Sequence, residues 1–363
     1  MRNKIIILLL FMSAFVFGQS VPNTNTFTLD SVKVVVGGNS LSQCFANSVD
    51  AYFDPTYKGS KDRLSNFRNY TIPSYNYASG KYITAVVYSG YIYRSNDYGS
   101  TWLQVGTSAI WRGVAMDSTA MYQTAVVNGG YIYRSVNWGA TWSAVGSSQY
   151  WNGIGVNKFS GVYQTAVSDN GIWTSSDHGS SWTQRLSGVS INSVFVSPTG
   201  QYQIAASNPG YIWISTNYGV SWTQNTAAGS KNWAGVYVTI HGSQYYGIVN
   251  GGYIWYLVPP SGTWHVSATW DDATHYWVDI AGSEDGTYRV ASAATKIWYY
   301  NSSTPGWVSD YTSGDWHLDT GNGKVMVACN VSGGGYLWKS LDYGSSWTKI
   351  YSTSRAWTDI ATN

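Results

Sequence analysis

Short apolar runs recur along the chain from residue 79 to its C-terminal end, separated by Gly-rich turns such as "NGG" at 128–130. Several runs, including "YIY" at 91–93 and "YIW" at 211–213, are apolar at every position instead of every second one. A strand that neighbours cover on both faces can be continuously apolar, whereas a strand with one exposed face alternates. The pattern therefore predicts many short strands that are buried on both sides.

These strands belong to a repeat of about forty residues. Each unit contains segments such as "WRGVAMD", "YQTAVV" and "YIYRS", then an octet that ends in Trp, then a short run, so each is predicted to form four strands. The closing tryptophans are Trp102, Trp142, Trp182, Trp222, Trp264, Trp307 and Trp347. The seven units predict an all-β fold, a seven-bladed β-propeller of four-stranded antiparallel blades.

The two ends of the repeat array are incomplete in complementary ways. The first unit begins at "KYITAVV" without a Trp-led inner strand, whereas the chain ends on "AWTDIATN", an inner strand with nothing after it. We expect the C-terminal strand to complete the first blade, because this closes the ring by backbone hydrogen bonds and removes its open edges.

The octet has the pattern Ser-x-Asp-x-Gly-x-x-Trp, which resembles the Asp-box, or BNR repeat, of sialidase-fold propellers, sortilin-type receptors and photosystem assembly factors. Two of the five copies carry Asn for Asp. Because Asp and Asn can both accept hydrogen bonds from turn amides, while Gly supplies a positive φ and Trp enters the core, we expect a structural role. The residues concerned are Ser95, Asp97, Gly99, Trp102, Asn137, Gly139, Trp142, Asp177, Gly179, Trp182, Asn217, Gly219, Trp222, Asp342, Gly344 and Trp347.

Function is expected on the face opposite the boxes, where the resemblance to sialidase-fold propellers implies that ligands are met. Second-to-third turns and connections between blades lie there. Six inner strands begin with Trp, and these indoles either pack between blades or form a platform for sugar rings. With the polar residues of the same connections, the candidate ligand-binding set is Trp111, Arg112, Trp151, Arg185, Trp233, Asp271, Asp272, His275, Trp277, Trp316, Arg355 and Trp357. Asp315 also lies on these connections.

Composition narrows the function classes. Only 10% of residues are charged, the net charge is +2, and there is no dense Lys/Arg run, which excludes a nucleic-acid partner. The chain has a single Glu, Glu284, and lacks the arginine motif of sialidases, whereas glycoside hydrolysis generally uses paired carboxylates. We therefore expect no enzymatic activity, no cofactor and no metal site; a divergent sialidase-like glycosidase remains an alternative.

The N-terminal region differs from the repeats. Residues 1–18 read as a secretory signal peptide, 19–78 as an N-terminal extension or docking arm, and 79–363 as the propeller. We expect a secreted, periplasmic or cell-surface protein without stable membrane insertion that recognises a glycan or a cell-surface protein. The other alternative is a structural component of an extracellular or phage virion assembly. Pairing of Cys44 with Cys329 is left open, although Cys329 lies in an apolar stretch typical of a buried thiol.

Overall fold

The computed structural model describes residues 80–259, 262–267, 274–293, 296–302, 304–312, 315–321, 323–331 and 334–363, with side chains omitted at 304–312, and two short strands before them. These are β1 (Val35–Val36) and β2 (Asn39–Ser40), which pair antiparallel. The chain divides into two compact units, Met1–Pro73 and Ser74–Asn363. The expected signal peptide, most of the 19–78 arm, Cys44, Asp271 and Asp272 lie outside the described residues.

The described residues of the second unit form antiparallel strands joined by turns, with no helix among them. In chain order the strands are β3 (Ile83–Val87), β4 (Gly90–Ser95), β5 (Leu103–Ala109), β6 (Trp111–Met116), β7 (Gln123–Ser135), β8 (Ser143–Val156), β9 (Gln164–Ser168), β10 (Gly171–Ser175), β11 (Thr183–Ser187), β12 (Ser193–Val196), β13 (Gln203–Ala206), β14 (Ile212–Ser215), β15 (Thr223–Asn225), β16 (Trp233–Val238), β17 (Tyr245–Gly252), β18 (Ile254–Leu257), β19 (Trp264–Val266), β20 (His275–Gly282), β21 (Tyr288–Ala293), β22 (Lys296–Asn301), β23 (Thr304–Thr312), β24 (Trp316–Thr320), β25 (Met326–Asn330), β26 (Gly335–Ser340), β27 (Thr348–Arg355) and β28 (Trp357–Thr362). The expected all-β class is confirmed.

Hydrogen bonding groups these strands into small antiparallel sheets. Three sheets have four strands: β12–β15, β24–β27, and β28 with β3–β5. A six-stranded sheet holds β6–β11 and an eight-stranded sheet holds β16–β23. The six-stranded sheet is continuous because β7 and β8 are long: the first part of β7 pairs with β6 and its second part with β8, whose own second part pairs with β9.

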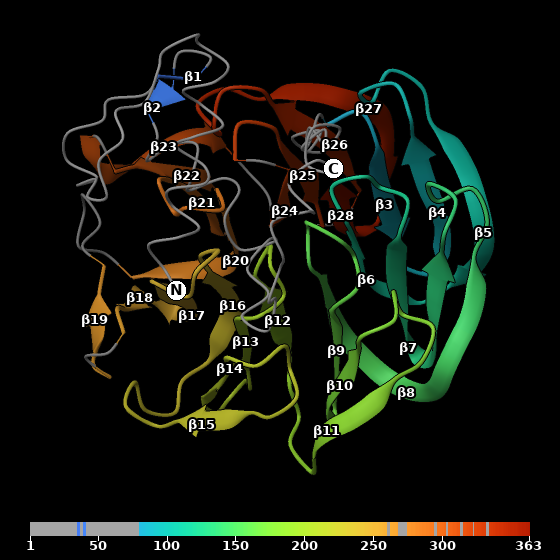
Figure 1. The fold of residues 1–363 in the computed structure, drawn as a ribbon. Helices are drawn as coiled ribbons and strands as arrows, with labels where there is room; N and C mark the ends of the chain where they lie inside the picture. The colour runs from blue at the N-terminus through green and yellow to red at the C-terminus, as the bar shows by residue number, and fades with distance from the viewer. Residues whose placement is uncertain are drawn as a thin grey trace, which may run out of the picture. The chain divides into compact units, whose positions relative to one another are not determined.

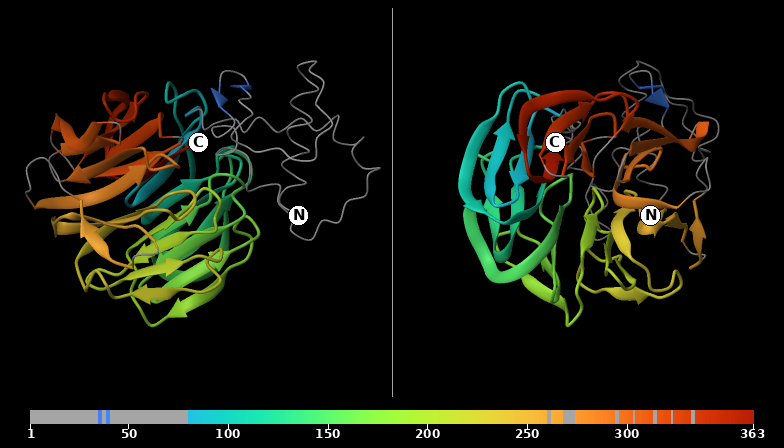
Figure 2. Two further views of the ribbon diagram at one scale, coloured as in Figure 1. Left: turned by 60° about the vertical axis from the view of Figure 1, so that its left-hand side comes forward. Right: turned by 180° about the vertical axis from the view of Figure 1, so that it is seen from behind.

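The sheets follow one another around a common centre (Figure 1), and the view from behind shows the same order (Figure 2). The innermost strands contact each other in the order β28, β6, the second part of β8, β12, β16, β20 and β24, and β24 in turn contacts β28. The arrangement is propeller-like, and it explains the continuously apolar strands. β3, for example, is buried at all five positions because a sheet covers each of its faces.

The ring closes as the sequence predicts. β28 pairs antiparallel with β3, from Trp357 opposite Val87 to Thr362 opposite Ile83. The backbone amide of Gly80 donates to the carbonyl of Asn363 at 2.9 Å. The C-terminal strand therefore occupies the inner position of the sheet that the first repeat begins.

Buried polar side chains also join neighbouring repeats. The hydroxyl of Thr84 donates to Gln123 Oε1 at 2.8 Å, and the hydroxyl of Thr124 donates to Gln164 Oε1 at 2.7 Å. Each glutamine amide then donates to a carbonyl three residues before it in its own loop. Because both ends of each amide are bonded, these buried polar groups escape the cost of desolvation without a partner and fix one repeat against the next.

Candidate functional site

The octets form hairpins whose Asp is held inside its own turn. At the third copy, Asp177 Oδ1 accepts from the Ser181 amide at 2.9 Å and from the Ser175 hydroxyl at 2.7 Å, and Oδ2 accepts from the Ser181 hydroxyl at 2.6 Å. Gly179 has φ +79°, and the indole of Trp182 donates to its carbonyl at 3.1 Å. These bonds lower the pKa of Asp177, although burial opposes the shift. The network has the geometry expected of a turn cap.

The Asn copies reproduce this network. Asn137 Oδ1 accepts from the Thr141 amide at 3.0 Å, and its amide donates to the Thr141 hydroxyl at 2.9 Å. The side chain exchanges one acceptor for one donor and keeps its hydrogen bonds to residue 141, so the Asp-to-Asn exchange is compatible with the turn. None of the hydrogen bonds in the Asn copies requires a carboxylate.

The face that carries these hairpins is called here the box face. The residue before each box Gly is aromatic and left-handed: Tyr98, Trp138, His178, Tyr218 and Tyr343 have φ between 57° and 63°. Cations from the preceding repeat bind three of their carbonyls. Arg94 donates to Trp138 O at 3.1 Å, Arg134 to His178 O at 2.6 Å, and Lys339 to Tyr98 O at 2.6 Å. Each bond joins one repeat to the next.

The six inner-strand indoles do not form a platform. Trp111, Trp151, Trp233, Trp277, Trp316 and Trp357 are all at most 4% exposed. All but Trp316 donate from Nε1 to a Gly carbonyl of the preceding repeat, at 3.0–3.1 Å, as Trp111 does to Gly90. The indoles fill the space between repeats because their large apolar rings gain most there. The hypothesis of a platform is therefore wrong, and the hypothesis of packing is correct.

The described polar candidates on the same connections have local contacts. The guanidinium of Arg112 lies over the Tyr88 ring at 5.7 Å, and that of Arg355 lies over the Tyr93 ring at 4.4 Å. Arg185 donates to the Thr174 hydroxyl at 3.0 Å from β11. None of these contacts joins one candidate arginine to another.

His275 lies within the aromatic packing around the indole of Trp277. Its ring is 5.0 Å from Trp277 and 5.0 Å from Trp298. Cys329 is buried on β25, as its apolar stretch predicts. Among the described residues, no group of three or more His, Cys, Asp or Glu side chains could hold a metal ion.

Exposed tyrosines occupy the face where the indoles were expected. Tyr150 and Tyr276 directly precede two of the buried indoles and are 63% and 68% exposed. Successive side chains of a strand point to opposite sides, so burial of each Trp turns the preceding Tyr outward. The dipeptide "YW" at 150–151 and 276–277 carried this signal in the sequence.

Exposed side chains recur on this face across the first three repeats. We call this set the tyrosine patch, and it comprises Tyr88, Tyr91, Ile110, Arg112, Tyr131 and Tyr150, all exposed. Neighbouring members are joined by backbone pairing: Gly90 pairs with Ala109, the Ile110 carbonyl accepts from Asn128 at 2.9 Å, and Asn128 pairs with Tyr150. The patch therefore combines aromatic area with one guanidinium.

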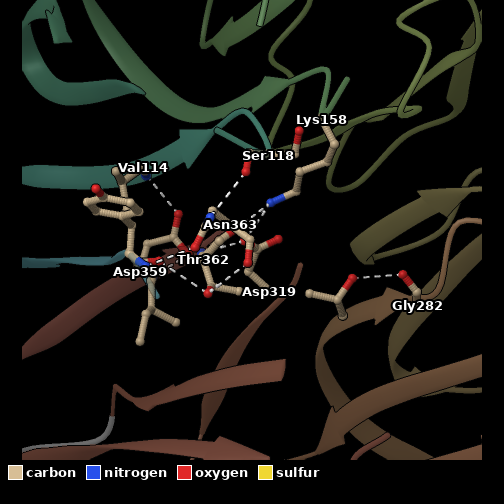
Figure 3. Close-up of polar contacts among 11 residues, drawn as sticks. Val114, Ser118, Lys158, Gly282, Asp319, Asp359, Thr362 and Asn363 are labelled. Atoms are coloured by element: carbon tan, nitrogen blue, oxygen red, sulfur yellow. Dashed lines mark hydrogen bonds and ion pairs between the residues drawn. The ribbon is translucent and has the colours of Figure 1, made fainter. Parts of the chain in front are cut away.

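A second polar cluster lines the innermost strands (Figure 3). Asp319 on β24 and Asp359 on β28, which Figure 3 labels, each accept a backbone amide from the next innermost strand, at 2.8–2.9 Å. Asp279 on β20 accepts one in the same way, at 2.9 Å. The donors are Leu318, Thr362 and Val114. Each carboxylate therefore fastens two neighbouring strands.

Lys158 and His317 complete this inner cluster. The Lys158 ammonium lies 2.9 Å from Asp319 Oδ2 and donates to the Thr362 carbonyl at 2.9 Å, so it connects the loop after β8 to the far side of the ring (Figure 3). His317 Nδ1 lies 3.9 Å from both Asp279 Oδ2 and Asp359 Oδ1. The imidazole thus faces two carboxylates across neighbouring inner strands.

Burial changes the acidity of this cluster. It raises the pKa of Asp359 to about 7, against the effect of His317, and it raises the pKa of Asp279 in the same way. Glu284, in the loop after β20, also has its pKa raised to about 7 by burial and by the neighbouring Asp285. The repeated "WxDIA" at 277–281 and 357–361 could have revealed the two inner aspartates from the sequence.

No family model matches the chain, and no curated protein is significantly similar to it in sequence. Solved structures with a similar fold show the fold class of the chain. An ancestral GH74 enzyme is 17% identical with a TM-score of 0.54, over 73% of this chain and 39% of that one. YCF48 bound to D1 peptide is 15% identical with a TM-score of 0.51, over 74% of this chain and 86% of that one. The Swd1 propeller domain from Myceliophteria thermophila is 10% identical with a TM-score of 0.56, over 70% of this chain and 91% of that one. The chain has the fold of a β-propeller.

These comparisons correct one expectation. The chain was expected to have no enzymatic activity because it lacks paired glutamates and the sialidase arginine motif, yet GH74 enzymes share its fold. The missing sialidase features therefore do not exclude catalysis, since one fold carries many chemistries. This chain spans about two fifths of the ancestral GH74 enzyme, and the likeness shows the fold alone.

Proposed function

We propose that this chain is an exported recognition protein, a seven-bladed propeller that binds a protein partner through the tyrosine patch. The observation that carries the proposal is the patch itself, in which exposed tyrosines and Arg112 adjoin one another on the face opposite the boxes. Tyr and Arg dominate the binding energy of protein interfaces because each combines a large contact area with hydrogen-bonding groups.

The count of seven blades is supported by the ring of innermost strands, which has one strand from each repeat. The six-stranded sheet then corresponds to two blades joined through β7 and β8, and the eight-stranded sheet to two blades joined where Asn250 pairs with Tyr276. The bonding network of the octets supports their assignment as Asp-boxes.

A protein partner is favoured by one further observation. YCF48, which shares the fold, is bound to a peptide in its solved structure. Within the described residues no helix is long and apolar enough to cross a membrane. A glycan is the competing ligand, because tyrosine rings also stack on sugars.

The test compares Tyr150→Ala with the unchanged protein. Both would be immobilised for affinity capture from extracellular protein and probed on a glycan array, with melting temperatures measured in parallel. We expect a specific captured protein whose affinity falls about tenfold in the variant, as for loss of one interface aromatic of about 1–2 kcal/mol, at an unchanged melting temperature. Trp138→Ala, an exposed aromatic on the box face, is the control.

Other results would redirect the proposal. Glycan binding lost in Tyr150→Ala would replace the protein partner by a sugar ligand. Equal capture by Tyr150→Ala and the unchanged protein would remove the tyrosine patch from recognition. Export is tested separately, since the mass of the mature protein should correspond to cleavage near Gln19.

A further inference from the structure

The residue before each box glycine is aromatic although its backbone is left-handed. The five residues, with φ between 57° and 63°, are Tyr98, Trp138, His178, Tyr218 and Tyr343. Bulky side chains rarely adopt this conformation, which Gly, Asn and Asp tolerate best. The turn alone therefore favours a smaller residue, and the reason for an aromatic ring lies in what its side chain contacts.

Three of the five rings pack against a tyrosine of the preceding repeat. The pairs, with the distances between their ring centroids, are His178 and Tyr122 at 3.9 Å, Tyr343 and Tyr288 at 3.8 Å, and Tyr218 and Tyr163 at 4.5 Å. The first two pairs are stacked, with their planes within 22° of each other. Because these contacts join one repeat to the next, packing explains the aromatic residue in these three boxes.

The rings of the first two boxes have no such partner. Tyr98 is 50% exposed and Trp138 is 43% exposed. Val325 occupies the stacking position before Tyr98, and Tyr82 occupies it before Trp138. In the described part of the chain neither box ring stacks on another aromatic ring. Packing therefore does not explain these two aromatic residues, whose rings face the solvent.

A groove of about 560 Å³ lies beside the first of these rings, where the last repeat meets the first. It is lined by Tyr98, by the hydroxyl residues Ser100, Ser346 and Thr348, and by Lys339. The Lys339 ammonium donates to the Tyr98 carbonyl at 2.6 Å and lies 5.8 Å from the centroid of its ring. Hydroxyls donate and accept hydrogen bonds, so the groove combines an aromatic ring with groups that can orient a small polar unit.

The second ring lies on the neighbouring hairpin of the same face. The guanidinium of Arg94, from the first repeat, donates to the Trp138 carbonyl at 3.1 Å and so joins the first two boxes. Val136, two residues before Trp138, is 40% exposed and enlarges the apolar surface there. A ligand that contacts both Tyr98 and Trp138 has to extend from one repeat to the next.

We propose that Tyr98 and Trp138 bind an extended neutral polysaccharide chain, separately from the tyrosine patch on the opposite face. The apolar face of one pyranose ring lies on Tyr98 and that of a later ring lies on Trp138, because Tyr and Trp offer a flat apolar face with a polar edge. Hydroxyls of the first pyranose face Thr348 and Lys339 in the groove. A neutral chain fits because the groove carries both signs of charge, Lys339 and Asp342.

The probes are three extended neutral polysaccharides, hydroxyethylcellulose, galactomannan and xylan, with the flexible glucan pullulan as the ligand control. Binding to the full chain is measured by isothermal titration calorimetry, with melting temperatures in parallel. Tyr98→Asn and Trp138→Asn remove the exposed rings and introduce a residue that the left-handed backbone accepts. Tyr343→Asn is the matched control, because it removes the ring at the same box position where that ring is stacked on Tyr288.

We expect at least one of the three extended chains to bind more tightly than pullulan. Tyr98→Asn and Trp138→Asn should each weaken that binding about five- to tenfold at an unchanged melting temperature, as for the loss of one stacked ring. Tyr343→Asn should lower the melting temperature and keep the affinity, and Tyr150→Ala should keep both.

Three results would overturn the proposal. The first is that none of the extended chains binds. The second is that Tyr98→Asn and Trp138→Asn bind as tightly as the unchanged protein, or that Tyr343→Asn weakens binding as much as they do. The third is that binding is lost in Tyr150→Ala alone, which would place the sugar on the tyrosine patch.

Discussion

Deletion of residues 357–363 tests whether β28 holds the ring closed. Trp357 and Ile360 are each 1% exposed and pack against β3 and its neighbours. Truncation of a buried Trp costs about 3–5 kcal/mol and of a buried Ile about 2–5 kcal/mol. Their sum, about 5–10 kcal/mol, is comparable with the whole stability of a typical domain, about 5–15 kcal/mol.

The deletion also leaves polar groups without partners. The Val114 amide loses Asp359, and the Lys158 ammonium loses the Thr362 carbonyl. Each partly buried group left unpaired costs about 1–3 kcal/mol more. We therefore expect no stable folded monomer after the deletion, and aggregation through the exposed edge of β3.

The assay is thermal unfolding followed by circular dichroism, with light scattering to detect aggregation. A rearranged chain provides the rescue: residues 356–363 and a two-residue link are placed directly before Gly80, whose amide bonds the Asn363 carbonyl. The rearranged chain should regain the parent's melting temperature because β28 can pair with β3 in the same register. A deleted chain as stable and monomeric as the parent, or a rearranged chain that does not recover, would refute this account of closure.

Three further substitutions test the box, the indoles and the inner cluster. Asp177→Ala should lower the free energy of unfolding, measured in urea titrations, by about 1–2 kcal/mol. Asp177→Asn should leave it nearly unchanged, because Asn137 accepts the same backbone hydrogen bond in its own turn. Equal losses in the two variants would contradict the capping role. Trp151→Ala should lower the free energy of unfolding by about 3–5 kcal/mol because the indole is fully buried. A stable variant with weakened partner binding would instead support the hypothesis that the indoles form a binding platform. Burial raises the pKa of Asp359 to about 7, so the folded state binds a proton there that the unfolded state has lost, and stability should fall as pH rises from about 4 to 7. Asp359→Asn should flatten that fall in urea titrations at pH 4.5 and 8, and an unchanged slope would show that other groups cause it.

The sequence determined the repeat and most of its architecture. Spacing of the closing tryptophans and continuously apolar strands were sufficient to predict an all-β fold of small sheets, because burial on both faces leaves a local signature. Closure by the C-terminal strand was also readable, since the orphan segment at 357–363 matched the strand missing before Ile83. The turn chemistry of the boxes followed from residue type alone, because its hydrogen bonds stay within eight residues.

The tertiary structure decided which side of each inner strand faces the solvent. A Trp at the start of a strand has the same local sequence whether its indole is buried between repeats or exposed on the surface of the ring. The sequence therefore could not decide whether the indoles pack between repeats or bind a ligand. In the folded chain Trp151 is buried and Tyr150 points outward. Likewise, the contacts of Asp279 and Asp359 with His317, and the hydrogen bond from Lys339 to the Tyr98 carbonyl, join residues up to 241 positions apart. Such proximity is set by the number of sheets and by how the ring closes, which are properties of the assembled chain and not of any local segment.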